Sequence, residues 1–289
     1  MLVPHIMRQL EYIPHKTWVD VFCGSGTVTF AKPPSEVEIM NDINGDITNF
    51  FSVLRDPLSA ERIHGFLEHT PLGRDEWKSC AEFQSVTEPV ERARQWYTRV
   101  MQGFTHQEGD KGWIGVSKGR NQSVSHFGHV HSLPYFTKRM QHMTIENKSF
   151  EEVIPLYDHP DTLFYCDPPY MQETRGSFGD YRHEMTYQQH EQLMQLVTTC
   201  QSQVIVSGYP SDLYSQYLKD WRLVKVERLA QVRNTSGGRS YKEGTPMRTE
   251  CIWIKEHARG LFSYGQGKDT VLADVPIPAN GTQSMLFSE

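Results

Sequence analysis

Short hydrophobic runs alternate with amphipathic segments along most of the chain. The runs at 18–22, 37–40, 162–166 and 203–207 are rich in β-branched and aromatic residues, and their length is typical of buried strands. The segment 183–200 places Leu193, Val197 and Cys200 at helical spacing. This alternation predicts an α/β domain with a mostly parallel sheet.

Two later hydrophobic runs have a different connection. Residues 222–229 and 250–254 are joined by a polar loop rich in glycine and serine. Such a connection predicts an antiparallel pair at one end of the sheet.

The alternation of strands and helices is interrupted between residues 70 and 143. It then resumes and continues to residue 256. We therefore predict a catalytic domain made of 1–69 and 144–256, an inserted and mainly helical subdomain at 70–143, and a flexible C-terminal tail at 257–289.

Composition narrows the class of protein. The chain has 289 residues, of which 38% are hydrophobic, enough for a substantial core. It lacks both an apolar stretch of about 18 residues and a signal-peptide pattern, so we expect a cytoplasmic protein without membrane association. The five cysteines are widely spaced, and we expect small buried hydrophobic residues rather than disulfides or a zinc site.

The net charge of −6 would normally argue against a nucleic-acid partner. However, the segment 92–139 holds eight basic and two acidic residues. This local excess is either a solvated face, as most charged segments are, or a surface that binds phosphates.

A glycine-rich motif follows the first predicted strand, from Asp20 through Phe22, Gly24 and Gly26. Thr29 stands where a dinucleotide-binding motif has its third glycine, and the Gly-Lys-Ser/Thr of a P-loop is missing. Asp42, after the second strand, is placed to bind a ribose. These features suit S-adenosylmethionine, which has a ribose but no pyrophosphate, although a G-x-G sequence alone is often an ordinary turn.

A second motif, Asp167-Pro168-Pro169-Tyr170, follows another predicted strand. If Asp167 and the Pro168 carbonyl accept the two hydrogens of an exocyclic amine, the lone pair of its nitrogen becomes available for methylation. Tyr170 offers a face on which a base can stack. The alternative is a strand that ends in a proline turn.

The sequence resembles the DNA adenine-specific methyltransferases, in the group that includes the DNA adenine methylases. The resemblance covers most of residues 1–256. It includes F-x-G-x-G at 22–26, N-D-x-N at 41–44, D-P-P-Y at 167–170, and the segments 174–175, 181–184 and 207–209. The resemblance implies a Rossmann-like fold with a seven-stranded, mostly parallel sheet. It also implies methyl transfer from S-adenosylmethionine to N6 of an adenine flipped out of double-stranded DNA.

The resemblance also implies roles for individual residues. The cofactor would be bound by Asp20, Phe22, Gly24, Gly26, Asp42, Ser149, Phe150 and Asp167, and catalysis would use Asp167, Pro168 and Tyr170. The segment 70–143 becomes the target-recognition region. The residues expected to contact DNA are Lys111, Lys118, Arg120, Arg139, Arg175, Tyr181, Arg233, Arg239 and Lys242.

Two features depart from the family pattern. Members usually begin with a Y-x-G-G-K segment, and Met1 stands just after the place where that segment would lie. Members also often carry an acidic residue at the position of Ser149. The first departure leaves open an alternative: a protein that binds DNA or a sliding clamp and whose cofactor site is degenerate.

Two further motifs have alternative interpretations. His126, His129 and His131 suggest a metal site, but without a carboxylate or cysteine cluster we expect structural or DNA-facing histidines and no metal. In the tail, Gln283, Leu286 and Phe287 resemble the peptide by which bacterial proteins bind the replication sliding clamp, although so short a match also arises by chance.

The sequence therefore predicts a bacterial or phage enzyme of the kind found in restriction–modification systems, a monomer or weak dimer. Methylation of RNA or of cytosine N4 remains the alternative activity.

Overall fold

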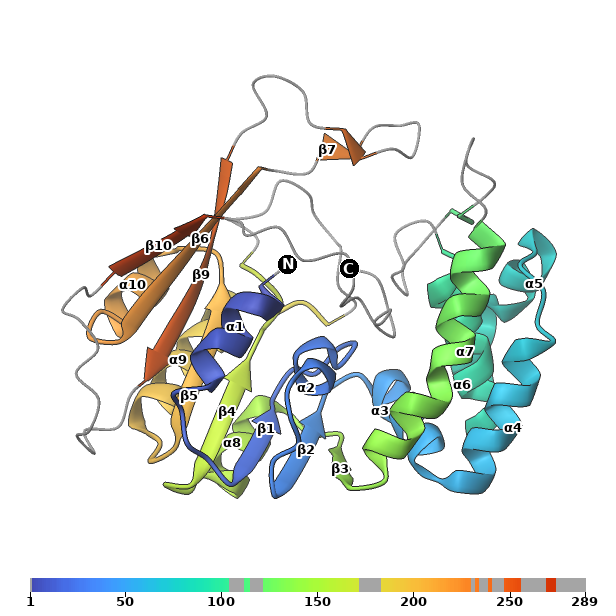
Figure 1. The fold of residues 1–289 in the computed structure, drawn as a ribbon, viewed down its shortest axis with the longest axis horizontal. Helices are drawn as coiled ribbons and strands as arrows, with labels where there is room; N and C mark the ends of the chain where they lie inside the picture. The colour runs from blue at the N-terminus through green and yellow to red at the C-terminus, as the bar shows by residue number, and fades with distance from the viewer. Residues whose placement is uncertain are drawn as a thin grey trace.

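Eight strands form one twisted sheet (Figure 1) in the order β10-β6-β9-β5-β4-β1-β2-β3. The computed structural model describes residues 2–103, 112–114, 122–171, 183–229, 232–233, 239–240, 247–255 and 269–273. The strands are β1 (Thr17–Asp20), β2 (Val37–Asn41), β3 (Met143–Glu146), β4 (Thr162–Cys166), β5 (Gln203–Gly208), β6 (Arg222–Leu229), β9 (Met247–Lys255) and β10 (Asp269–Ala273).

The predicted Rossmann-like architecture is confirmed. Strands β1 to β6 and β9 make the seven-stranded sheet, in which β9 pairs antiparallel with both β5 and β6. The sequence did not predict β3, which is short and lies at the edge. An eighth strand, β10, pairs parallel with β6, so part of the segment 257–289, expected to be a tail, is a strand.

Two predicted boundaries shift for local reasons. β1 ends at Asp20 because the glycine loop begins there, although the backbone N–H of Val21 still bonds to Tyr165. The helix expected over 183–200 is α9 (Tyr187–Thr199). It starts at residue 187 because Thr186 and Gln189 form a capping box.

Helices cover both faces of the sheet. On one face, α1 (Val3–Leu10) and α2 (Thr27–Ala31) share a buried apolar cluster with Trp18, Leu163 and Tyr165. The other face is covered by α8 (Phe150–Tyr157), α9 and α10 (Asp212–Tyr217). This sandwich fixes the strand ends from which the candidate site is built.

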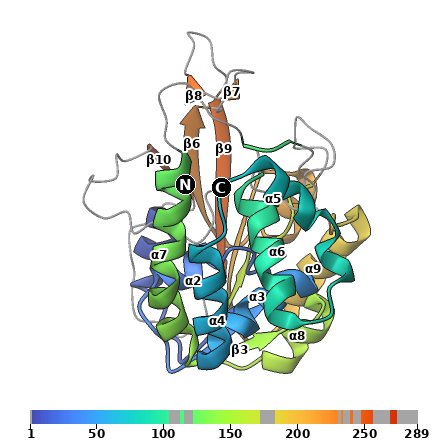
Figure 2. The ribbon, with the colours of Figure 1, turned by 90° about the vertical axis from the view of Figure 1, so that its right-hand side faces the viewer.

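A separate block of helices stands beside the β3 edge (Figures 1 and 2). It contains α3 (Gly45–Arg55), α4 (Pro57–Glu68), α5 (Arg74–Ser79), the 3-10 helix η1 (Cys80–Ser85), α6 (Pro89–Met101) and α7 (Gln122–Met140). The inserted region is thus mainly helical. Helix α4 precedes the predicted start of the insert at residue 70, but it packs with the insert. Its residues Ile63 and Leu67 lie in the same buried cluster as Tyr97 of α6 and Leu133 of α7.

Within the part of the chain that the structure describes, every helix is too short or too polar to cross a membrane. All five cysteines are free thiols, and four of them are buried as the sequence predicts, whereas Cys200 is partly exposed.

Candidate active site

The candidate site lies at the point in the sheet where the order of the strands reverses. β1 has β2 on one side and β4 on the other, which is the topological switch point at which open α/β sheets bind their ligands. Asp20 is the last residue of β1, Asp42 follows β2, and Asp167 follows β4. The fold therefore brings the two sequence motifs together at the carboxyl ends of the parallel strands, which we call the carboxyl edge of the sheet.

The glycine loop requires both of its glycines. Gly24 and Gly26 have φ of +46° and +69°, in the left-handed region that side chains disfavour. A Cβ on Gly26 would lie 2.5 Å from a ring carbon of Phe30, whereas a Cβ on Gly24 would meet no atom of the described residues within 4 Å. Gly26 thus serves the packing of the loop, and Gly24 borders open space that a ligand can approach.

Asp42 holds this loop. Its Oδ2 accepts a hydrogen bond from the backbone N–H of Gly24 at 2.9 Å, and its Oδ1 accepts one from the N–H of Asn44 at 2.8 Å. Asn44 in turn caps α3 by accepting from Asp46. The carboxylate expected to bind a ribose is therefore fixed by backbone donors on both sides.

Two asparagines, to which the sequence analysis gave no role, hydrogen-bond to the backbone of the loops that follow β1, β2 and β3. Asn41 donates from Nδ2 to the carbonyls of Val21 and Lys148, at 2.9 and 3.0 Å. Asn147 donates from Nδ2 to the carbonyl of Asp42 at 2.8 Å. Asn41 stands in the N-D-x-N motif and could have been found there, but Asn147 is more than a hundred positions from its partner.

Asp20 is an acid buried beneath the site, with 1% of its surface exposed. Its Oδ2 accepts from the Thr29 hydroxyl at 2.6 Å, and that hydroxyl accepts from Trp18 Nε1 at 2.8 Å. Asp20 Oδ1 has no hydrogen-bond partner in the part of the chain that the structure describes. Thr29 thus replaces the missing third glycine with a side chain that binds Asp20.

The electrostatics of Asp20 reflect its neighbours. Burial raises its pKa to about 7, because the charged form loses hydration. The hydrogen bond from Thr29 opposes this shift, and the negative charges of Asp167 and Asp42 add to it. Asp20 is therefore close enough to both Asp42 and Asp167 for their charges to act on it.

The D-P-P-Y tetrapeptide leaves the carboxyl end of β4 and contacts the end of β5. Ser207 donates its hydroxyl hydrogen to Asp167 Oδ1 at 2.8 Å. The rings of Tyr170 and Tyr209 meet at 64° with their centroids 4.7 Å apart. Pro168 is buried, whereas Asp167 and Tyr170 are partly exposed.

The pair Ser149 and Phe150 does not match its expected role. Ser149 begins α8 in a capping box, in which Glu152 accepts from its N–H at 3.0 Å. Phe150 is only 6% exposed and packs against Phe22, with centroids 5.9 Å apart. A ring that stacks on a ligand needs an open face, so Phe150 is a core residue here. Ile43, 48% exposed beside Asp42, offers apolar surface instead.

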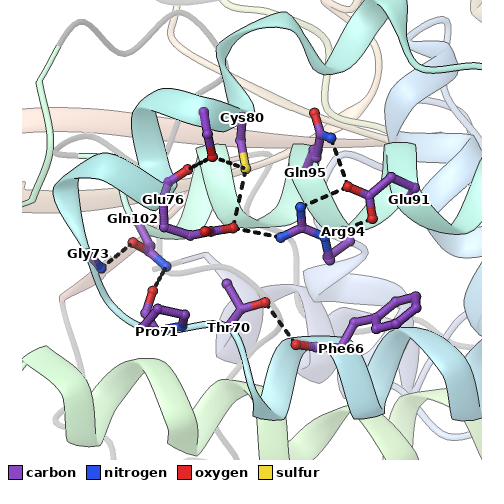
Figure 3. Close-up of polar contacts among 11 residues, drawn as sticks. Phe66, Thr70, Pro71, Gly73, Glu76, Cys80, Glu91, Arg94, Gln95 and Gln102 are labelled. Carbon is purple, nitrogen blue, oxygen red and sulfur yellow. Dashed lines mark hydrogen bonds and ion pairs between the residues drawn. The ribbon is translucent and has the colours of Figure 1, made fainter.

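The arginines of the helical block mostly serve the fold. Arg92 pairs with Asp46, and Arg99 stacks on Trp77 with its guanidinium carbon 3.5 Å from the ring centroid. In Figure 3, Arg94 bridges the carboxylates of Glu76 and Glu91, each at 2.8 Å. The excess positive charge counted along the sequence is therefore only partly available to DNA.

Arg139 corrects a prediction. It was expected to contact DNA, but its guanidinium pairs with the buried carboxylate of Glu38 near the start of β2. That is the amino end of the strand, away from the edge with Asp42 and Asp167. Arg139 therefore links α7 to the sheet.

The other predicted DNA contacts are described only in part. Arg233 and Arg239 are register partners in a two-stranded ribbon of β7 (Val232–Arg233) and β8 (Arg239–Ser240). This ribbon lies in the connection from β6 to β9, at the carboxyl edge (Figure 1). The remaining residues lie outside the described residues: Lys111, Lys118, Arg120, Arg175, Tyr181 and Lys242.

The three histidines of α7 differ in burial. His126 is buried, and desolvation lowers its pKa to about 4, so it is neutral near pH 7. His131 is exposed. Among the described residues, no group of three or more His, Cys, Asp or Glu could hold a metal ion. Gln283, Leu286 and Phe287, the residues of the clamp-like peptide, lie outside the described residues.

Sheet order, glycine loop and clustered carboxylates together define a Rossmann-like methyltransferase fold. A family model for D12 class N6 adenine-specific DNA methyltransferases matches residues 1–232. The chain belongs to this family, whose activity is the methylation of adenine in DNA. A search of curated proteins found no match.

Proposed function

We propose that the protein transfers a methyl group from S-adenosylmethionine to N6 of an adenine that is flipped out of double-stranded DNA. The observation that carries this proposal is the meeting of the glycine loop, Asp20, Asp42 and Asp167 at one switch point of the sheet. One half of that site suits a cationic nucleoside, and the other half suits an amine.

The residues of the first half fit the cofactor. S-adenosylmethionine carries positive charge on its sulfonium and its amino group. The carboxylates of Asp42 and Asp167 create a negative potential, to which Asp20 adds when it loses its proton. Asp20 Oδ1 is a buried acceptor to which no described residue donates. Open space beside Gly24 admits a ligand close to the backbone. These features speak against a degenerate cofactor site.

When bound, the cofactor supplies an electrophilic methyl group on its sulfonium. The protein has to raise the nucleophilicity of the adenine amine and hold it in line. Asp167 and the Pro168 carbonyl would accept the two amine hydrogens, which draws the nitrogen toward tetrahedral geometry and returns its lone pair from the ring. The consecutive prolines fix the backbone that presents this carbonyl.

The same edge suits an extracted base. Flipping a base out of a duplex costs a few kcal/mol, and stacking on an aromatic side chain recovers about 1–3 kcal/mol per base. Tyr170, backed edge-on by Tyr209, is the aromatic residue beside Asp167. Contacts of the β7–β8 ribbon with phosphates would supply the remainder.

Replacement of Asp167 tests the proposal. Asp167→Ala should abolish incorporation of labelled methyl into duplex DNA, while calorimetry still detects binding of S-adenosylmethionine. Asp161→Asn, at the other end of β4, is the control and should methylate like the wild type.

Analysis of digested nucleosides should find N6-methyladenine in DNA exposed to the wild type. N4-methylcytosine, methylated RNA as the only product, or an Asp167→Ala variant with near wild-type transfer would each contradict the proposed function. Mapping of modified adenines after expression in a methylation-free host would then identify the recognition sequence.

A further inference from the structure

A chain of buried hydroxyl groups runs behind the D-P-P-Y tetrapeptide. Tyr165 of β4 and Ser207 of β5 lie 3.1 Å apart, oxygen to oxygen, and Ser207 is 2.8 Å from Asp167 Oδ1. Both residues are buried. Because a carboxylate only accepts, the Ser207 hydrogen points to Asp167, and the Tyr165 hydroxyl then donates to Ser207.

The far end of this chain is itself fixed. The ring of Tyr165 stacks on Trp18 at 13°, with centroids 5.7 Å apart. Trp18 donates from Nε1 to Thr29, which binds Asp20. Two buried sets of hydrogen bonds, joined by the stacked rings of Tyr165 and Trp18, therefore span the adjacent strands β1, β4 and β5 and link Asp20 to Asp167.

We infer that Ser207 is a positioning residue for methyl transfer, whose hydroxyl fixes the Asp167 carboxylate in the direction that the adenine amine requires. This inference rests on the proposed function of Asp167. A hydrogen bond at Oδ1 removes rotation of the carboxylate and so sets the direction of its other oxygen. The dry surroundings strengthen each of these hydrogen bonds, since little water competes for it.

The end of β5 supports the tetrapeptide at two points. Ser207 holds Asp167, and Tyr209, two residues on, meets the ring of Tyr170. The acceptor for the amine and the stacking surface for the base are thereby fixed by one strand end. Their mutual spacing does not depend on the tetrapeptide alone.

The chain provides a matched control for this inference. Ser202, just before β5, is also fully buried, and its hydroxyl also donates to an aspartate, Asp158, at 2.7 Å. It lies at the opposite end of the strand from Ser207. Ser202→Ala therefore removes the same kind of bond from the same strand without touching the candidate site.

The experiment compares Ser207→Ala with Ser202→Ala. We expect Ser207→Ala to lower the single-turnover rate of methyl transfer about 10- to 100-fold, because small displacements of a reacting group cost that much. Its Kd values for S-adenosylmethionine and for DNA should stay within about twofold of the wild type. Ser202→Ala should lower the melting temperature similarly and leave the rate unchanged.

Two more variants sharpen the test. Tyr165→Phe removes the donor behind Ser207 and should slow transfer by a smaller factor, and Ser207→Thr keeps a hydroxyl and should recover most of the rate. If Ser207→Ala does not fold, this pair decides the matter: a Tyr165→Phe rate equal to that of the wild type would overturn the inference.

The outcomes separate the two proposals. An active wild type, an inactive Asp167→Ala and a fully active, folded Ser207→Ala would refute the positioning role and leave the proposed function intact. Equal slowing by Ser202→Ala and Ser207→Ala would show that the effect is structural and would also refute it. A wild type without methyl transfer would overturn the proposed function, and this inference with it.

Discussion

Asp20 combines burial with the charges of two neighbouring acids. Its raised pKa of about 7 has a consequence for stability. In the unfolded chain the group loses its proton near pH 3.9, whereas in the folded protein it keeps the proton to about pH 7. Between these values the unfolded chain binds fewer protons, so Asp20 makes the fold less stable as the pH rises through this window.

Asp20→Asn should remove this pH dependence. The amide oxygen can still accept from Thr29, but it carries no charge to desolvate. We expect the variant to gain stability relative to the wild type on going from pH 5 to pH 8, by an amount on the order of 2–3 kcal/mol. Urea unfolding at both pH values measures this gain. The same difference between the proteins at both pH values would contradict the interpretation.

At the scale of elements, the attachment of α7 to the sheet depends on a buried ionic cluster. Glu38 of β2 accepts from Lys32 Nζ at 2.6 Å and from Arg139 of α7. Burial by itself would raise the pKa of Glu38, but the hydrogen bonds from Arg139 and Lys32 outweigh it and lower the pKa. Its contribution to stability is therefore present above the unfolded pKa and lost as the pH falls through the folded one.

Arg139→Ala should destabilise the fold without weakening the binding of DNA. The arginine and Glu38 side chains are 13% and 2% exposed, and removing one partner of a buried pair costs about 3 kcal/mol or more. The exposed neighbour Lys138 is the control, since Lys138→Ala should change stability by less than about 0.5 kcal/mol. Chemical unfolding and fluorescence anisotropy with duplex DNA, measured on both variants, check the two parts. A smaller slope of log K for DNA against log salt in Arg139→Ala would instead support the DNA contact that the sequence predicts.

At the scale of the whole molecule, the net charge of −6 conceals an uneven distribution. The arginines at 92, 94, 99 and 139 are engaged inside the helical block or at the sheet. We therefore expect any contact of the insert with phosphates to fall mainly to Lys111, Lys118 and Arg120, which lie outside the described residues. The β7–β8 ribbon lies in the connection between β6 and β9, on the side of the sheet where the parallel strands end (Figure 1).

Binding of duplex DNA should weaken steeply with salt despite the acidic total. Each neutralised phosphate contributes about −0.9 to the slope of log K against log salt. About five contacts then predict a loss of about 10²- to 10³-fold between 50 and 200 mM salt. Replacing Lys111, Lys118 and Arg120 by alanine should reduce the slope by about three, whereas Lys219→Ala, on an exposed turn after α10, should not change it. A flat salt dependence of the wild type would contradict this division of charge.

The sequence by itself determined the class of fold and the motifs of the site. Runs of β-branched and aromatic residues predict β1, β2, β4, β5, β6 and β9, because a buried strand needs such side chains over a short length. The glycines and the D-P-P-Y tetrapeptide are equally local, since positive φ and consecutive prolines restrict which residues can occupy a turn.

Tertiary structure decided which side chains serve the site and which serve the fold. Arg139 and Phe150 have the residue types expected of a DNA contact and a stacking surface, but packing places one on Glu38 and the other in the core. Asn147 lies in no motif, and Ser207 belongs to the segment 207–209 of the resemblance but its role was not predicted, because the partners Asp42 and Asp167 come from other strand ends. Such roles depend on distances across the sheet, and only the folded chain sets these distances.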